Sequence, residues 1–111
     1  MKPTPGTGAV IAAVFEAVEQ RKQAMPPKSY VAGLLREGTS AIGCKLAEET
    51  GEVIKAAREQ STEILTKELC DLLFHAIVLM ADKDIRLFDL EAELSRRHGI
   101  SGLDEKASRK T

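Results

Sequence analysis

The sequence predicts an all-α protein, a helical bundle of about four to five helices. Apolar residues recur at three- and four-residue intervals through most of the chain, and no stretch shows the strict alternation of a half-buried β-strand. Proline and glycine clusters separate these periodic segments, whereas no repeat or linker marks a second domain. A chain of 111 residues is close to the usual size of one domain with one core, so residues 1–111 are expected to form a single domain.

The first helix is expected over residues 8–22, after a disordered leader at residues 1–8 that is rich in proline, glycine and threonine. Its apolar side chains recur on one face at helical spacing, as Val14 and Val18 illustrate. The segment at residues 25–29 is expected to end this helix, because two consecutive prolines cannot continue one.

Serine, threonine and glycine residues predict where the next two helices begin and end. Ser29 is expected to cap a short helix that ends at Gly38. Either Thr39 or Ser40 is expected to cap a third helix, which runs to about Arg58 and is followed by a polar turn.

A fourth, unusually apolar helix is expected over residues 62–82. Between Leu69 and Ala81 only Asp71 and His75 are strongly polar. A helix that is apolar on all sides must be buried on several of them. We therefore expect a second copy of the chain to complete the core, as a homodimer.

The end of the chain is expected to be mostly polar. Leu87, Leu90 and Leu94 form the apolar face of a last helix over residues 87–97. Residues 99–111 then lack an apolar pattern and are expected to be a polar tail.

Composition excludes several classes of function. Hydrophobic residues make up 43% and charged residues 30% of the chain, as in ordinary globular proteins. A net charge of -1 provides no field for a polyanion, and 4% aromatics without tryptophan provide no base-stacking platform, so no nucleic-acid partner is expected. No segment approaches the ~18 apolar residues that a membrane span needs. A cytoplasmic protein without a membrane partner is expected.

The two cysteines, Cys44 and Cys70, are far apart in the sequence, and neither has a CxxC partner. Both fall within expected helices. A disulfide is one interpretation, but reduced and buried thiols of a cytosolic protein are the favoured one.

Three glutamates stand close together in the segment LAEETGEVIKAA of the third helix. Glu48 and Glu52 are four residues apart, and Glu49 and Glu52 are three apart, so like charges are neighbours on one helix face. Such neighbours destabilise a helix. Taken alone, the segment is explained by a solvated face.

The fourth helix adds a second pair of carboxylates, Glu68 and Asp71, inside its apolar run. A buried carboxylate must be neutralised by a basic side chain, a proton or a cation. The pair Glu49 and Glu52 lies on the preceding helix, which a short turn makes antiparallel. These four residues are therefore the expected ligands of a hard, octahedral ion, Mg²⁺ or Mn²⁺. His75, one turn beyond, is either a partner behind these ligands or a hydrogen-bonded core residue.

The two acidic motifs, EExxE at residues 48–52 and ExxD at residues 68–71, resemble those of the MazG-type all-α nucleotide pyrophosphohydrolases. More narrowly, the chain resembles the phosphoribosyl-ATP pyrophosphohydrolase family of histidine biosynthesis. The matching segments, which cover most of the chain after residue 28, are SYVAGLLREGTSAI, KLAEETGEVIKAA, ELCDLLFHAIVLMAD and SGLDEKASRK. The resemblance implies a MazG-like bundle.

The resemblance also implies a reaction, the Mg²⁺-dependent hydrolysis of 1-(5-phosphoribosyl)-ATP to 1-(5-phosphoribosyl)-AMP and pyrophosphate. Mg²⁺ held by carboxylates can bridge phosphate oxygens and acidify a bound water. Glu48 and Glu49 are the candidate catalytic residues, with Glu48 orienting or deprotonating the water. Lys45, Lys55 and Arg58 are candidates to bind phosphates, and equally candidates for solvated cations on the helix flank.

Two other functions stay open on the sequence alone. A MazG-like house-cleaning enzyme would apply the same chemistry to other nucleoside triphosphates. A non-catalytic helical dimerisation module would carry its acidic residues only as solvated surface.

Overall fold

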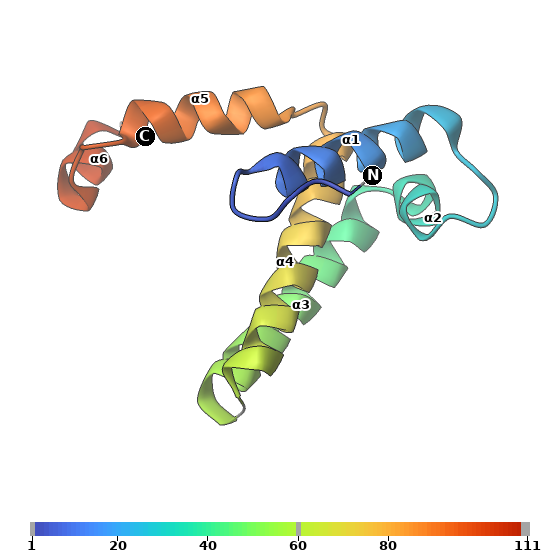
Figure 1. Cartoon of the computed structure of the whole chain (residues 1–111), viewed down its shortest axis with the longest axis horizontal. Coiled ribbons are helices and arrows are strands. Elements are labelled where there is room, and N and C mark those ends of the chain that lie inside the picture. Colours follow the sequence, from blue (N-terminus) through green and yellow to red (C-terminus); the bar gives the residue numbers. More distant parts are fainter. Residues whose placement is uncertain (1, 60, 110–111) are drawn as a thin grey trace.

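The computed structural model describes residues 2–59 and 61–109, which form six α-helices and no β-strand (Figure 1). The all-α prediction is confirmed, with one helix more than the four to five expected. In chain order the helices are α1 (Ala9–Ala24), α2 (Tyr30–Glu37), α3 (Thr39–Glu59), α4 (Thr62–Asp82), α5 (Leu87–Arg97) and α6 (Gly102–Ser108).

The two longest helices, α3 and α4, form an antiparallel hairpin, and α1 and α2 cover one end of it (Figure 1). At that end the Thr39 hydroxyl donates a hydrogen bond to Asp82 Oδ2 at 2.7 Å, which joins the start of α3 to the end of α4. The prediction that Thr39 or Ser40 caps α3 is wrong. Helix α3 begins at Thr39, directly after Gly38, whose φ of 98° only glycine adopts easily.

Serine side chains cap three of the helices, because each accepts a hydrogen bond from a free backbone N–H in the first turn. Ser29 caps α2 as predicted, accepting from the N–H of Ala32 at 3.1 Å. Ser61 caps α4, and Ser101 caps α6, at 3.3 and 3.0 Å. These caps fix where α2, α4 and α6 start, and therefore which side chains face the hairpin.

The buried core lies at the α1–α2 end of the hairpin. Side chains from four helices meet there, and the members are Val18, Val31, Leu34, Ile42, Ile77, Val78 and Ala81. Lys22 of α1 joins this end to the turn after α4, since its ammonium donates to the Ala81 carbonyl at 2.7 Å and pairs with Asp84. Among the described residues, the other half of the hairpin has no such cluster of buried apolar side chains.

Helices α5 and α6 extend from the bundle as an arm and make few contacts with α1–α4 (Figure 1). The radius of gyration is 16.0 Å, whereas a compact chain of this length has about 13 Å. Helix α6 lies inside the segment predicted as a polar tail, residues 99–111, so the prediction missed a helix there. The predicted leader forms no helix over residues 2–8, and residues 1, 110 and 111 lie outside the described chain.

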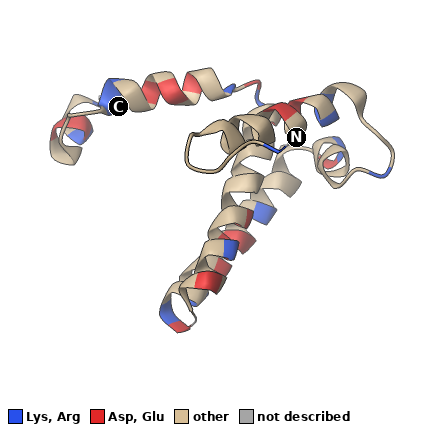
Figure 2. Ribbon diagram, viewed as in Figure 1, with Lys and Arg blue, Asp and Glu red and all other residues tan. Residues whose placement is uncertain are grey.

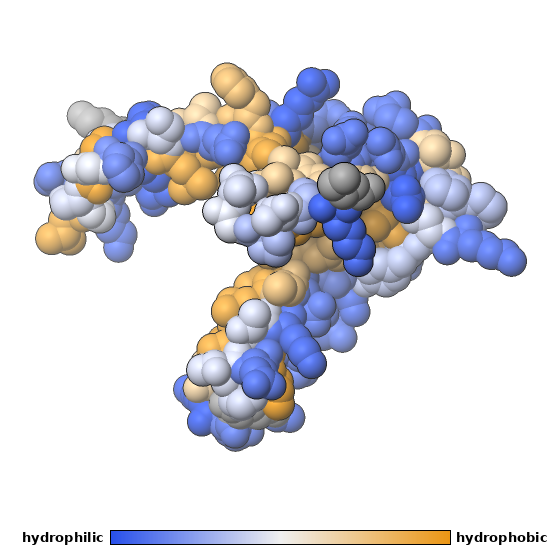
Figure 3. Space-filling view, in the orientation of Figure 1, coloured by the Kyte–Doolittle hydropathy of each residue, from blue (hydrophilic) through white to orange (hydrophobic). Residues whose placement is uncertain are grey.

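Hydrophobic side chains remain exposed along the α3–α4 hairpin and beneath α5 (Figure 3). Leu69 is 47% and Leu73 42% exposed, so within one copy the apolar run of α4 is not covered on all sides. The prediction of buried thiols is wrong for the single chain, since Cys44 and Cys70 are free but exposed. Asp71, also expected to be buried, is exposed.

No helix in the described part of the chain has the length and apolarity needed to cross a bilayer. The cytoplasmic location stays a prediction.

Candidate functional site

Three carboxylates from the two helices of the hairpin meet at one place, Glu49 of α3 with Glu68 and Asp71 of α4. One oxygen of each lies within 4.8 Å of one oxygen of the other two. Glu68 and Asp71 are three residues apart and so lie on successive turns of one face, while Glu49 faces them from the antiparallel neighbour. We call these three residues the acidic cluster. The acidic cluster lies within the α3–α4 hairpin. Charged residues gather in the half of that hairpin farther from α1 (Figure 2).

The surroundings of the acidic cluster disfavour the charged form of Glu68. Partial burial raises the pKa of Glu68, and the negative charges of Asp71, Glu52 and Glu49 raise it further. Glu52, the fourth predicted ligand, is therefore close enough to act on Glu68, although it lies outside the three-residue cluster and is exposed. A cation placed between carboxylates this close would lower their electrostatic free energy.

The residues of the cluster fit a hard divalent cation. The donors are all carboxylate oxygens, which Mg²⁺ and Mn²⁺ prefer. One oxygen of each carboxylate lies within 4.8 Å of the others, so a single divalent ion would contact all three after side-chain rotation. Among the described residues, no lysine or arginine forms an ion pair with Glu49, Glu68 or Asp71.

The other predicted site residues lie along α3. Lys45 Nζ and Glu48 Oε2 form an ion pair at 3.5 Å, one turn from Glu49. Glu48 is exposed and points outside the cluster, as the sequence predicted from its helical phase. Lys55 and Arg58 are exposed, further toward the α3–α4 turn, and pair with no acidic residue of the described chain.

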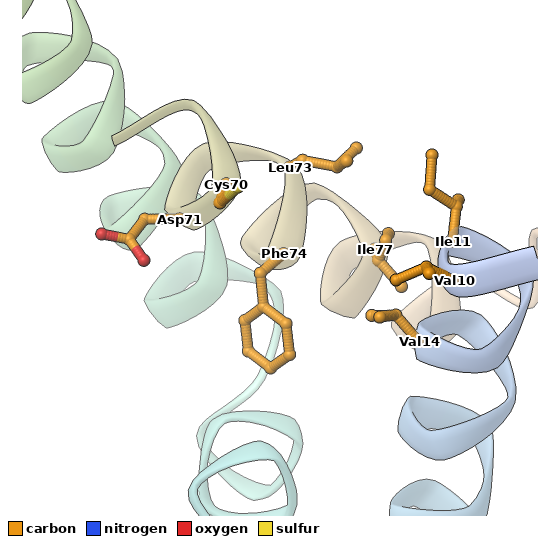
Figure 4. A pocket seen from close by; sticks show the side chains of 8 residues that line it. All are labelled: Val10, Ile11, Val14, Cys70, Asp71, Leu73, Phe74 and Ile77. Atoms are coloured by element: carbon orange, nitrogen blue, oxygen red, sulfur yellow. The ribbon is translucent and has the colours of Figure 1, made fainter. Parts of the chain in front are cut away.

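A groove of about 390 Å³ runs between α1 and α4 (Figure 4). Its walls are almost entirely apolar, with Val10 and Ile11 of α1 facing Leu73 of α4. Asp71 borders the groove, but its carboxylate points away from these apolar side chains (Figure 4). The groove therefore offers apolar surface and no second catalytic group.

A hydrogen-bonded pair that the sequence did not predict lies behind Asp71. His75 is 6% exposed, its Nδ1 is 2.8 Å from the backbone oxygen of Asp71, and its Nε2 is 2.8 Å from the Tyr30 hydroxyl. The open question about His75 is answered in part, since it is a hydrogen-bonded core residue. The same contacts connect it to a predicted ligand. Tyr30 lies 45 residues away in the chain, so no sequence spacing could reveal the pair.

The arm contains a second group of carboxylates with the opposite electrostatics. Arg96 donates to Glu93 at 2.8 Å and to Glu105 at 2.6 Å, and Arg97 donates to Glu93 at 2.8 Å. These bonds lower the pKa of Glu93 to about 2, and Arg96 likewise lowers the pKa of Glu105. We call this group the arginine cluster. Its ion pairs connect α6 to α5.

Comparisons with known proteins place this geometry in a family. The model of the family described as phosphoribosyl-ATP pyrophosphohydrolase matches residues 12–98. The chain belongs to the phosphoribosyl-ATP pyrophosphohydrolase family. A phosphoribosyl-ATP pyrophosphatase of Nitrosospira multiformis is 46% identical over 95 residues, which are 86% of this chain and 78% of that protein.

Two further relatives with the same name agree in length as well as in sequence. One from Neisseria meningitidis is 43% identical over 100 residues, 90% of this chain and 94% of the relative. One from Chromobacterium violaceum is 45% identical over 101 residues, 91% of this chain and 94% of the relative. The family match contains the whole acidic cluster and ends at His98, before α6.

Proposed function

We propose that this protein hydrolyses 1-(5-phosphoribosyl)-ATP to 1-(5-phosphoribosyl)-AMP and pyrophosphate, with Mg²⁺ as its cofactor. The observation that carries the proposal is the acidic cluster, three converging carboxylates with which no lysine or arginine of the described residues forms an ion pair, in a chain of this family. A divalent cation would relieve the repulsion that raises the pKa of Glu68.

Glu49, Glu68 and Asp71 would hold the cation, and Glu52 would join them after a change of rotamer. A cation held there would supply positive charge next to the phosphates and would lower the pKa of a water. The reaction adds water across the anhydride between the α and β phosphates: a new P–O bond forms, the bridging P–O bond breaks, and pyrophosphate leaves.

The α3 residues next to the cluster would handle the proton and the phosphates. Glu48 is next to Glu49 in the sequence, and its side chain is exposed. Its carboxylate would take the proton of the attacking water. The Lys45 ammonium lies 3.5 Å from Glu48 Oε2, and it would donate a further hydrogen bond to a phosphate oxygen. Lys55 and Arg58 extend the same flank of α3 and would meet the more distal phosphates.

The decisive experiment measures pyrophosphate release from phosphoribosyl-ATP by the purified protein, with Mg²⁺ and with EDTA. Release that needs Mg²⁺ is expected. A parallel panel of common nucleoside triphosphates is expected to give much slower release. Faster release from that panel would favour the house-cleaning activity, and no release from well-folded protein with any substrate would contradict both.

We also propose that two copies of the chain form a homodimer. Large apolar side chains are exposed on both the hairpin and the arm, including Leu69, Leu73 and Phe88, the last of them 76% exposed. A monomer seldom leaves this much apolar surface in water, and burial of such side chains drives association.

Size-exclusion chromatography with light scattering tests the dimer. The wild type is expected at twice the mass of one chain, and Leu73→Glu is expected to shift it toward the monomer, because a charge would be buried in the interface. Lys28→Glu, an exposed residue between α1 and α2, is the matched control and should leave the mass unchanged. A wild type of single-chain mass would contradict the proposal.

A further inference from the structure

The chain exposes far more surface than a compact monomer of its mass does. Its accessible surface is 8245 Å², whereas a folded monomer of this mass exposes about 6,000 Å². The excess of about 2,200 Å² is larger than the roughly 800 Å² that each partner buries in an interface of standard size. The chain therefore has enough surface for a large and permanent interface.

The arm presents an apolar face that its own chain leaves open. On α5, the side chains of Leu87, Leu90 and Leu94 recur at helical spacing. Within one copy no residue of α5 is buried, and Leu94 is 57% and the neighbouring Phe88 76% exposed. A helix with an apolar face packs that face against another element in a folded protein.

The turn after α4 holds the arm away from its own bundle. The Ile85 N–H donates to the Met80 carbonyl at 2.8 Å. Asp84, at a φ of 58°, pairs with Lys22 of α1. These contacts set the direction in which α5 leaves the bundle, and Figure 1 shows it extending away from the α3–α4 hairpin. Folding α5 back onto its own α4 would break them.

The groove between α1 and α4 matches the apolar face of α5 in length and in pattern (Figure 4). On α4 its wall runs from Cys70 to Ile77, a step of seven residues that spans about 10 Å of helix. The face of α5 runs from Leu87 to Leu94, also a step of seven residues and about 10 Å. Both faces repeat at three- and four-residue intervals, the spacing at which helices pack side by side.

We propose that α5 of each copy docks in the α1–α4 groove of a second copy, so that the homodimer exchanges its arms. This inference rests on the proposed homodimer and assigns the two surfaces that meet in it. Each copy offers one arm and one groove, so two copies related by a twofold axis occupy both grooves and the assembly closes. Leu94 of one copy and Leu73 of the other are then buried in the same interface.

Cross-linking tests the contact directly, because Cys70 lines the groove and is exposed. One chain carries Cys44→Ser and keeps Cys70 as its only thiol. A second chain lacks both native thiols and carries Leu87→Cys, Leu90→Cys or Leu94→Cys. The two chains are co-expressed and oxidised, and peptide mapping identifies the cross-linked residues. A disulfide between the groove and the arm can form only between copies.

Ala92→Cys is the matched control, since Ala92 is exposed on the opposite face of α5. A disulfide needs Cα atoms within about 7 Å, so at least one apolar-face position is expected to give about tenfold or more cross-linked product than Ala92→Cys. Equal yields from both faces, or no cross-link from either, would overturn the proposal. So would a disulfide within one copy of a chain that has both thiols, because the arm would then occupy its own groove.

A charge on the arm gives a second measurement that needs no added thiol. Leu94→Asp is expected to raise the Kd of the dimer about thirtyfold or more in sedimentation equilibrium, because a carboxylate would be buried in the interface. Ala92→Asp is expected to stay within about threefold of the wild type. Leu94 is already exposed in the single chain, so this change leaves its fold intact.

The outcomes separate this inference from the proposals on which it rests. If Leu73→Glu dissociates the dimer and Leu94→Asp does not, the homodimer stands and the exchange of arms is wrong. A wild type of single-chain mass would contradict both. Release of pyrophosphate is measured independently and decides the proposed hydrolysis alone.

Discussion

The acidic cluster and the arginine cluster contain the same kind of side chain in opposite surroundings. In the acidic cluster, partial burial raises the pKa of Glu68, and the neighbouring carboxylates raise it further. In the arginine cluster, Glu93 receives hydrogen bonds from Arg96 and Arg97, and its pKa falls to about 2. In the arm the arginines form ion pairs with these carboxylates, whereas in the hairpin Lys45 pairs with Glu48, and no described lysine or arginine pairs with the three residues of the acidic cluster.

This difference separates a structural from a functional use of charge. The ion pairs of the arm need nothing from outside the chain, and they hold a helix of only seven residues in place. The hairpin keeps three carboxylates together, where partial burial and mutual repulsion raise the pKa of Glu68.

The largest effect is expected from neutralising the acidic cluster. The double change Glu68→Gln with Asp71→Asn is expected to lower the rate of pyrophosphate release about a hundredfold or more, because two of the proposed cation ligands lose their charge. Glu93→Gln in the arginine cluster is the matched control and should stay within about twofold of the wild type. Equal losses from both changes would remove the distinction between the clusters.

A smaller effect is expected from Mg²⁺ on the stability of the fold. A ligand at ten times its Kd adds about 1.4 kcal/mol to the free energy of unfolding, which corresponds to a rise in melting temperature of about 5 °C for a domain of this size. Differential scanning calorimetry with millimolar Mg²⁺ and with EDTA measures it. Glu49→Gln is expected to lose this rise and Glu93→Gln to keep it. A wild type whose melting temperature ignores Mg²⁺ would contradict the metal site.

The smallest effect is expected from pH, with opposite signs for the two clusters. The pKa of Glu93 is lowered from 4.5 to about 2, so the stabilisation it provides is complete above pH 4.5 and is lost as the pH falls toward 2. The pKa of Glu68 is raised, so its charge destabilises the fold at neutral pH, and that penalty is relieved as the pH falls toward 4.5.

Variants separate these two contributions in urea unfolding at pH about 7, 4.5 and 3. Without metal, Glu68→Gln is expected to remove part of the gain in stability between the first two pH values. Glu93→Gln is expected to remove part of the loss of stability between pH about 4.5 and 3. The helical chemical shifts of α5 and α6 report this loss. The same pH profile for both variants would mean that the two clusters do not differ.

Most of the fold could be predicted because it depends on local sequence. The bounds of α2, α4 and α5 follow from caps and from apolar residues at helical spacing, and the structure has them within a residue or two. Helix α6 was missed because its seven residues carry no apolar face. It is held by Glu105 and Arg96, a contact between two helices that no periodicity shows.

The candidate site was predictable only as far as helix geometry reaches. The spacing of acidic residues on α3 and α4 predicts Glu49, Glu68 and Asp71, because the helix faces that carry them lie opposite each other in an antiparallel hairpin. Spacing does not determine rotamers, so Glu52 was expected in the same group and lies outside it. The contact of Tyr30 with His75 depends on how α2 packs against α4, which only the three-dimensional structure provides.

The position of the acidic cluster also has a consequence for the order of folding. All its members lie between Glu49 and Asp71, in two neighbouring helices joined by a short turn. Contacts close in sequence generally form faster than distant ones. We therefore expect repulsion within the cluster to slow the formation of the hairpin as well as to lower its final stability.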